Sequence, residues 1–217
     1  GQIYKVGAPS IVVQAIGSLM TYGMNLILAA FGSAQTVFGI YFKLQSFVFM
    51  PVFGLNNGMV PIIAYNYGAG HKDRVIKTIK HSVAYGVGIM FAGLLVMHIF
   101  PAQLMRMFDA EESLIAIGAP ALETISLSFV FAGFCIVAGS VFQALGNGVY
   151  SMIVSVARQM CVLLPVAKLL SLSGEVTLIW WAFPIAELAS VLLTSYFLVR
   201  IYRKVICHIG EPVVQDA

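Results

Sequence analysis

Long apolar segments separated by short polar ones run along the whole chain. Hydrophobicity rises over six of them, at residues 9–31, 36–64, 75–100, 114–145, 149–171 and 176–200. Each is long enough to cross about 30 Å of hydrocarbon as an α-helix, which takes roughly 20 apolar residues. The pattern predicts an all-α membrane protein, a bundle of about six transmembrane helices. The connections are short, so we expect one six-helix lobe over residues 1–205 and a cytoplasmic tail over 206–217.

The overall composition agrees with a chain that is surrounded by lipid. Hydrophobic residues make up 60% of the sequence and charged residues 10%, and the mean hydropathy is +0.94. About a quarter of the residues in a soluble domain are charged. The chain begins at Gly1 with no basic segment and cleavage site of a signal peptide, and this start favours a truncated form of a longer protein.

Lysine and arginine are distributed unequally between the two sets of loops. One side holds most of them: Lys5, Lys72, Arg74, Lys77, Lys80, Arg200, Arg203 and Lys204, with Arg158 near it. The other side holds one cation beside three acids: Arg106, Asp109, Glu111 and Glu112. Because cytoplasmic loops carry the excess of basic residues, we expect a multi-pass protein of the cytoplasmic membrane with both termini in the cytoplasm. Basic residues at membrane edges set topology, which argues against nucleic-acid binding.

Prolines and small residues occur inside the predicted helices. Membrane helices tolerate proline where neighbours satisfy the freed carbonyls, and we expect Pro51 to kink the second helix near its middle. Pro61 and Pro165 are expected to interrupt helices in the same way, and Pro184 lies in the last predicted helix. Gly54 and Gly58 form a GxxxG spacing that lets helix backbones approach closely. Generic bundle packing and the moving helices of a transporter both use such features.

Four ionisable residues lie inside the predicted spans: Lys43, Glu123, Lys168 and Glu187. A charge there must face the bundle interior or a wet cavity. Glu187 lies nearest the middle and is the first candidate for a carboxylate that takes up a coupling cation or proton; alternatively it is a structural partner of Lys43 or of a backbone donor. Glu123 is the second candidate, although it can also reach water. Lys43 is a candidate counter-charge, and Lys168 is expected to extend to the interface.

Motifs of other chemistries are absent from the sequence. Cys135, Cys161 and Cys207 have neither CxxC spacing nor a histidine at ligand distance, so neither disulfides nor a metal site are expected. No HExxH, GxSxG or pair of intramembrane aspartates occurs, which argues against an enzyme. No repeated filter sequence of an ion channel occurs either. We expect no cofactor.

Several motifs, spread over nearly the whole chain, resemble one transporter family. They are KVGAPSIVVQ at residues 5–14, LAAFG at 28–32, FVFMP at 47–51, GLNNGMVPI at 54–62, YNYGAGHKDRV at 65–75, VFQALGNG at 141–148 and WAFPIAELASVLL at 181–193. Arg158 and Pro165 on the fifth helix add to the set. In this order they resemble the carboxy-terminal lobe of the multidrug and toxic compound extrusion (MATE) family of efflux transporters.

The resemblance implies one half of a transporter with about twelve helices, in which two six-helix lobes surround a central cavity. It implies secondary active efflux of small organic cations, coupled to transported Na+ or H+ through alternating access. The implied partners are the amino-terminal lobe, absent from this sequence, and the lipid bilayer. Some family members place an acidic ion ligand on the first helix of this lobe, but residues 9–31 contain no Asp or Glu. The other half is therefore an alternative location for the coupling carboxylate.

The resemblance also points to residues of the cavity and of the cytoplasmic turns. Gln14 and Gln45 are the preferred cavity residues because they lie on helices that line the family's cavity, although an amide can also bond a neighbouring helix. The other cavity candidates combine an amide with soft sulfur and ring surfaces that suit varied cations: Asn25, Met24, Met50 and Phe47. The candidates for gating or for the turns are Asn66, Gly68, Gln143 and Gly146.

Two other functions stay open. A lipid-linked oligosaccharide flippase of related fold is expected to line its cavity with several cations for pyrophosphate, and the spans offer Lys43 and Lys168. A truncated lobe could instead be a non-transporting assembly partner of another membrane protein. An in-frame upstream sequence that encodes six more spans would favour the transporter.

Overall fold

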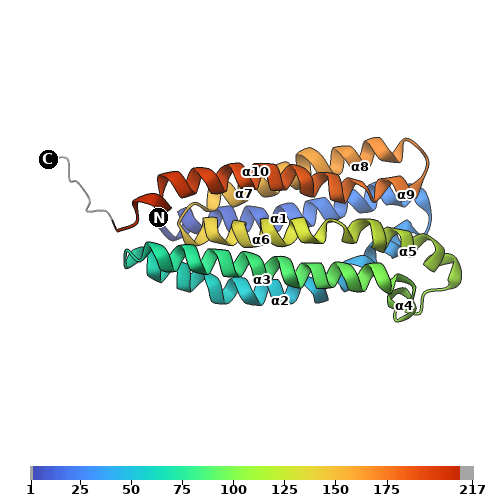
Figure 1. The fold of residues 1–217 in the computed structure, drawn as a ribbon. Helices are drawn as coiled ribbons and strands as arrows, with labels where there is room; N and C mark the ends of the chain where they lie inside the picture. Colours follow the sequence, from blue (N-terminus) through green and yellow to red (C-terminus); the bar gives the residue numbers. More distant parts are fainter. Residues whose placement is uncertain (1, 211–217) are drawn as a thin grey trace.

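The computed structural model describes the backbone of residues 2–210 and the side chains of Pro9 and of residues 11–210. In this part of the chain, helices run side by side along one long axis (Figure 1). The first half contains α1 (Gln2–Leu28), η1 (Ala29–Phe31), α2 (Ala34–Gly68), α3 (Lys72–Ile99) and α4 (Pro101–Arg106). The second half contains α5 (Glu112–Ser126), α6 (Phe129–Ala144), α7 (Gly148–Val156), η2 (Ala157–Leu163), α8 (Leu164–Ser171), α9 (Val176–Ile179), α10 (Ala182–Lys204) and η3 (Ile206–His208).

The predicted bundle of six membrane-crossing helices is confirmed. Five stretches are long and apolar enough to span a bilayer: Ile11–Phe31, Ala34–Gly68, Lys72–Ile99, Gly148–Ser171 and Val176–His208. A sixth crossing consists of α5 and α6, which are bent by 49° relative to each other at a short break. The amino terminus, the α2–α3 turn, the α6–α7 turn and η3 lie at one end of the bundle, and α4, α5 and α9 lie at the other (Figure 1).

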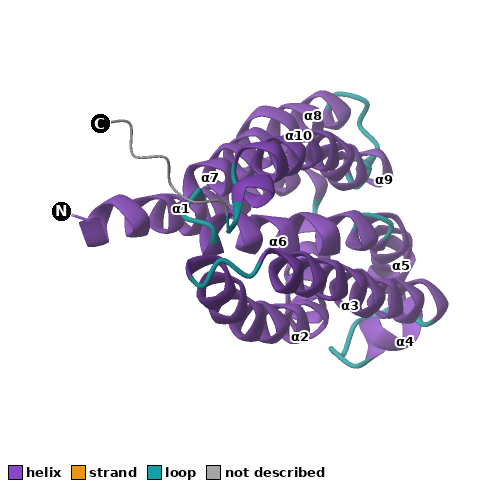
Figure 2. Ribbon diagram, turned by 60° about the vertical axis from the view of Figure 1, so that its left-hand side comes forward, coloured by secondary structure: helices purple, strands orange, loops and turns teal. Residues whose placement is uncertain are grey.

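Helix α6 occupies the centre of the bundle. Figure 2 shows α2 and α3 on one side of α6, and α7, α8 and α10 on the other. Of these, α2, α3, α7 and α10 contact α6 directly. Its buried positions are therefore spread around the helix, and its apolar sequence FVFAGFC is suited to packing on several faces.

The fifth crossing is irregular in its middle. Residues Ala157–Leu163 form a π-helix between α7 and α8, and Pro165 follows it in the first turn of α8. Proline lacks the N–H that would bond the carbonyl four residues back, so one hydrogen bond of the α-helical ladder is missing at this point. The expected interruption at Pro165 is therefore present.

The interruption expected at Pro61 is absent, whereas the kink expected at Pro51 stays a prediction. Helix α2 continues as one element through Pro51 and Pro61, so neither proline divides it. Neighbouring helices can satisfy the carbonyls that proline leaves free in a membrane helix. Pro184 lies in the first turn of α10, where backbone N–H groups have no partner within the helix in any case.

The tail expected over residues 206–217 is described only as far as Gly210. Its first residues pack back against the bundle, where Ile206 is buried in η3. The amine of Lys72, the first residue of α3, donates a hydrogen bond of 2.8 Å to the carbonyl of Cys207. The described part of the tail is thus tied to the α2–α3 turn, while residues 211–217 lie outside the described chain.

Close packing between α3 and α6 depends on two glycines. A Cβ at Gly133 would lie 2.8 Å from Cγ of Met90 and 3.1 Å from the carbonyl oxygen of Gly86. A Cβ at Gly86 would lie 2.6 Å from Cγ2 of Val137. The GxxxG pair does not make the close helix contact expected of it. A Cβ at Gly54 or Gly58 would meet nothing within 4 Å, so this spacing does not bring two helices together here.

We expect Gly133→Ala to lower the free energy of unfolding by about 1–3 kcal/mol, because the new methyl group must displace the backbone of α3. Gly88→Ala is the matched control, since this glycine of α3 has nothing within 4 Å of a Cβ and receives the same gain in helix propensity. Thermal unfolding in detergent measures both. Equal stability of the two variants would contradict the close α3–α6 contact.

Candidate substrate and ion site

A cavity of about 890 Å³ opens between α1, α2, α6, the α7–η2 segment and α10. Its size falls within the range of sites that hold small organic molecules. One wall is polar and comes from η2, α7 and α10. The opposite wall is largely aromatic and comes from α2. The cavity is therefore amphipathic, with its charge confined to one side.

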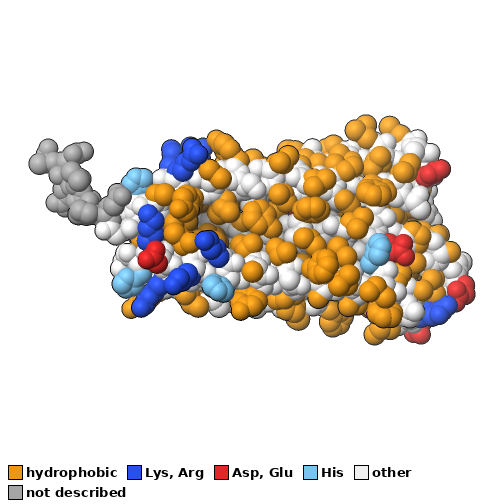
Figure 3. Space-filling view, in the orientation of Figure 1, with side chains coloured by type: hydrophobic (Ala, Val, Ile, Leu, Met, Phe, Trp, Pro, Cys, Tyr) orange, Lys and Arg blue, Asp and Glu red, His pale blue; other side chains and the backbone are white. Residues whose placement is uncertain are grey.

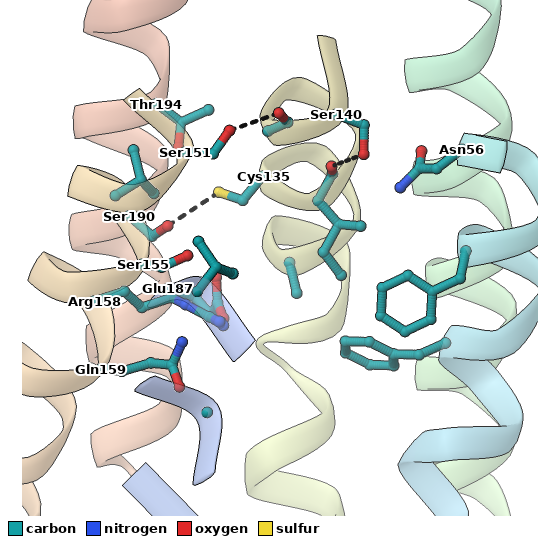
Figure 4. A pocket seen from close by; sticks show the side chains of 18 of the residues that line it. Asn56, Cys135, Ser140, Ser151, Ser155, Arg158, Gln159, Glu187, Ser190 and Thr194 are labelled. Atoms are coloured by element: carbon teal, nitrogen blue, oxygen red, sulfur yellow. Dashed lines mark hydrogen bonds and ion pairs between the residues drawn. The ribbon is translucent and has the colours of Figure 1, made fainter. Parts of the chain in front are cut away.

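A buried ion pair lies at the centre of the polar wall. Arg158, the second residue of the π-helix, donates a hydrogen bond from Nη1 to Oε1 of Glu187 on α10. The side chain of Glu187 is 7% exposed and that of Arg158 is 31% exposed. Figure 4 shows the two side chains close together, with Gln159 and Ser155 beside them. Both residues of the pair line the cavity.

The carboxylate of Glu187 is only half satisfied. Its Oε1 accepts from Arg158, but its Oε2 is buried and has no hydrogen-bond partner within the described residues. An ionised carboxylate offers about four lone-pair positions, and a buried acceptor without a partner is costly. Oε2 is therefore an acceptor for a proton, a small cation or a donor group that enters the cavity.

Helical periodicity gathers the other polar groups on the same wall. On α10, Glu187, Ser190 and Thr194 recur at spacings of three and four and so share one face. The hydroxyl of Ser190 donates to Sγ of Cys135 over 3.4 Å. Oγ1 of Thr194 has no partner within the described part of the chain. The row extends the polar surface along the cavity from the ion pair to Thr194 (Figure 4).

The α7–η2 segment supplies a second polar row. Ser151 and Ser155 lie one turn apart, and Arg158 and Gln159 follow on the same face. The hydroxyl of Ser151 donates to the carbonyl of Gly139 on α6 over 2.7 Å, which fixes α7 against the central helix. Gln159 is 5% exposed, and its Oε1 would lie 4.0 Å from a Cβ placed on Gly17 of α1.

The facing wall on α2 combines rings with two amides. Phe49 packs edge-on against Phe129, with 5.5 Å between ring centroids. Asn56 and Asn57 lie further along the same helix, and Asn56 is seen across from the ion pair in Figure 4. Oδ1 of Asn56 is buried with no hydrogen-bond partner among the described residues. This wall offers ring faces to a cation and amide groups to a polar substituent.

Several of the residues proposed from the sequence lie in this cavity. Glu187, Gln14, Gln45 and Met50 all line it. Met24 does not, because it is fully buried in the core. Asn25 lies outside the cavity and donates to the carbonyl of Thr21 over 2.9 Å. Phe47 also lies outside it, on the outer surface with 72% of the residue exposed.

The other charged candidates are separate from the cavity. Lys43 is exposed and its Nζ lies 5.6 Å from the centroid of the Phe108 ring. Glu123 is half-buried on α5 and does not line the cavity. Lys168 is exposed on α8, in agreement with a side chain that extends outward. The partner of Glu187 is thus Arg158 rather than Lys43.

The position expected for Arg158, near the cations of the cytoplasmic side, is wrong, because its side chain lies in the wall of the cavity. Arg158 follows the start of α7 at Gly148 by ten residues, which corresponds to a rise of about 15 Å, half the thickness of the hydrocarbon. Helix counting alone could therefore have placed it deep in the membrane. Its partner could not be deduced in this way, because that depends on how α10 packs against η2.

The residues proposed for the turns make backbone contacts at the end that holds the termini. The carbonyl of Asn66 accepts from the N–H of His71 over 2.9 Å, and the carbonyl of Gln143 accepts from Gly146 over 3.0 Å. Gly146 has a φ of 75°, which glycine adopts without strain. Gly68 is the last residue of α2, and Gly70, with a φ of 74°, makes the turn.

An apolar six-helix bundle that holds a polar, ligand-sized cavity is typical of a polytopic membrane transport protein. The sequence matches the profile of the MatE family over residues 9–169. The chain belongs to this family, which confirms the resemblance to MATE transporters.

The similar proteins are about twice as long as this chain. It is 26% identical over 205 residues to the multidrug export protein MepA of Staphylococcus haemolyticus, which covers 94% of this chain and 45% of MepA. The structure of the MATE multidrug transporter DinF-BH matches with 33% identity and a TM-score of 0.81, over 92% of this chain and 45% of DinF-BH. The Vibrio cholerae MATE transporter VcmN in its bent form has the same fold, with a TM-score of 0.88 and 17% identity over 95% of this chain and 47% of VcmN. The chain thus spans about half of each relative, and its bundle corresponds to one lobe of a two-lobed transporter.

We expect Arg158→Met or Glu187→Gln alone to destabilise the chain more than the two together. Each single change leaves the other group without its partner, which costs about 3 kcal/mol for a buried pair. Thermal unfolding of the two single variants and the double variant in detergent measures the coupling between them. Effects that simply add would contradict an interacting pair.

Proposed function

We propose that this chain is the carboxy-terminal lobe of a secondary active transporter that exports small organic cations in exchange for H+ or Na+. Its partner is an amino-terminal lobe of the same kind, and the two lobes alternate access to a shared cavity. The observation that carries the proposal is the Arg158–Glu187 pair, with Oε2 of Glu187 free, in the wall of a cavity of about 890 Å³. The multidrug export function in the names of MepA and DinF-BH supports the same class of substrate.

The charge of the polar wall gives a physical reason for exchange. When Glu187 is ionised, it neutralises Arg158 and its Oε2 can attract a cation. When Glu187 takes up H+ or Na+, the wall carries the uncompensated charge of Arg158. Two like charges about 5 Å apart at an effective dielectric constant near 20 repel by about 3 kcal/mol. An organic cation and the coupling ion therefore exclude each other at this wall, which is the condition for antiport.

The remaining walls suit an organic substrate of variable shape. Gln14 and Gln45 offer amide groups that can pair with polar substituents, and Met50 offers a soft apolar surface. Aromatic rings on α2, among them Phe49 and Phe53, can face a positive charge. The coupling ion, H+ or Na+, is cargo in this mechanism rather than a resident cofactor.

The charge distribution supports a cytoplasmic position for both termini. Lysine and arginine gather at the end of the bundle that holds the termini, and acidic side chains gather at the opposite end (Figure 3). Positively charged segments are retained on the cytoplasmic side of a membrane. We therefore place the end with the α2–α3 turn in the cytoplasm and the α4–α5 end outside, in the cytoplasmic membrane of a bacterium.

In the complete transporter, Glu187→Gln should abolish the dependence of efflux on the ion gradient, because the neutral amide takes up no proton and lacks the negative charge that attracts Na+. Glu123→Gln tests the second candidate and should have a smaller effect, since Glu123 lies outside the cavity. Glu175→Gln is the matched control for the loss of one carboxylate, because Glu175 is exposed and lies just before α9, outside the cavity. Dye efflux from vesicles, with pH and Na+ varied separately, measures each variant. Unchanged coupling in Glu187→Gln, Glu123→Gln and their double variant would remove both residues from the mechanism.

A further inference from the structure

A second hollow lies on the outer face of the bundle, away from the cavity described above. It is a groove of about 500 Å³ between α2 and α3, and Gly54, Gly58 and Ile62 line it from α2. Lys77, His81 and Tyr85 line it from α3. These residues recur every four positions on each helix, so each set forms a row inclined about 26° to the helix axis. The groove therefore runs mainly along the helices, close to the direction of acyl chains in a bilayer.

The floor of the groove is apolar and open. Gly54 and Gly58 are exposed, and a Cβ at either position would meet nothing within 4 Å. Ile62 is 49% exposed and Tyr85 is 61% exposed along its sides. The two glycines thus create a trough in an exposed, largely apolar surface, and an unbranched alkyl chain has the shape to lie in it.

One end of the groove is basic. Lys77 and His81 are exposed and lie one turn apart on α3. Nδ1 of His81 lies 2.7 Å from the carbonyl oxygen of Lys77, to which it donates, so Nε2 is the ring nitrogen left for a ligand. Among the described residues, no acidic one lines the groove. Asp73 lies one turn before Lys77 but forms no ion pair with it in the described structure.

The basic end also lies at the depth of the lipid headgroups. Helix α3 has 28 residues, which gives a length of about 42 Å, against about 30 Å of hydrocarbon. A centred helix therefore extends about 6 Å beyond the hydrocarbon at each end. Lys77 is about 7.5 Å from the start of the helix, so its amine can reach the phosphate layer. His81 is about 13.5 Å from the start, but its ring lies back over the preceding turn, against the carbonyl of Lys77, and so points towards the same layer. Gly54 is about 12 Å deeper than Ile62 along α2.

We propose that this groove binds one anionic phospholipid, with its phosphate at Lys77 and His81 and an acyl chain over Gly54 and Gly58. The depth and direction of the groove fit a lipid of the leaflet at the end that holds the termini. The charge favours an anionic headgroup over a zwitterionic one, because the cationic group of phosphatidylcholine would offset the attraction to Lys77. This site is independent of the transport cavity, since α3 contributes no residue to that cavity.

The test is lipid binding by the purified chain in mild detergent, and by the complete transporter that contains it. Native mass spectrometry with phosphatidylglycerol or phosphatidylcholine counts the lipid retained at each concentration. Phosphatidylglycerol should bind at least about five-fold more tightly, and Lys77→Gln should weaken it about five-fold, as expected for the loss of one cation near an anionic lipid. Lys80→Gln is the matched control for charge, because Lys80 is exposed on α3 but does not line the groove.

The shape of the groove is tested without a change of charge. The double variant Gly54→Leu/Gly58→Leu fills the trough in α2 and should lose the tightly bound lipid, whereas Gly88→Leu, at an open position of α3, should retain it. Equal binding of the two lipids, equal effects of the changes at Lys77 and Lys80, or retention of lipid by the filled trough would each overturn the proposal. Binding by the chain alone but not by the complete transporter would mean that the second lobe covers the groove, which also overturns it.

Discussion

A charged side chain between the ends of these helices needs a partner or water, because hydrocarbon offers neither. Most of the structure follows from how this requirement is met. Basic residues lie mainly at one end of the bundle and acidic ones mainly at the other (Figure 3), and the most deeply enclosed charges, Arg158 and Glu187, pair with each other. The pair brings η2 and α10 together and sets the polar wall of the cavity. The candidate function rests on this one interaction.

Local irregularity in the fifth crossing positions that pair. Pro165 removes one hydrogen bond from the helix, and the π-helix that precedes it carries Arg158 and Gln159 on the wall of the cavity. Single π turns within α-helices occur frequently at functional sites, because they re-aim side chains at a cost in regular hydrogen bonding. A half-satisfied carboxylate beside this segment can exist in two charge states with different affinities for a cation. The fold thus supplies both the geometry and the electrostatic difference that exchange requires.

The sequence predicts the bundle well because hydrophobic length alone defines membrane spans. The sequence also identifies Glu187 as a candidate site residue, because a carboxylate within a membrane span must face the bundle interior or a wet cavity. The prediction that Met24, Asn25 and Phe47 line the cavity is wrong. The core and the lipid are both apolar, so the periodicity of a helix does not tell its inward face from its outward one. The break between α5 and α6 was also missed, since no proline or glycine marks Leu127 and Ser128. The partner of Glu187 depends on tertiary packing, and helix counting gives only the depth of Arg158.

The most direct test of a hydrated cavity around the ion pair is the reactivity of single cysteines towards a water-soluble maleimide. Cys135, Cys161 and Cys207 are first replaced by alanine, and Ser155→Cys, in the polar wall, is compared with Leu192→Cys, on the outer surface where that residue is 75% exposed. The account predicts rapid labelling at position 155 and slow labelling at position 192, where lipid excludes the reagent. Slow labelling at 155, or equal labelling at both positions, would contradict it.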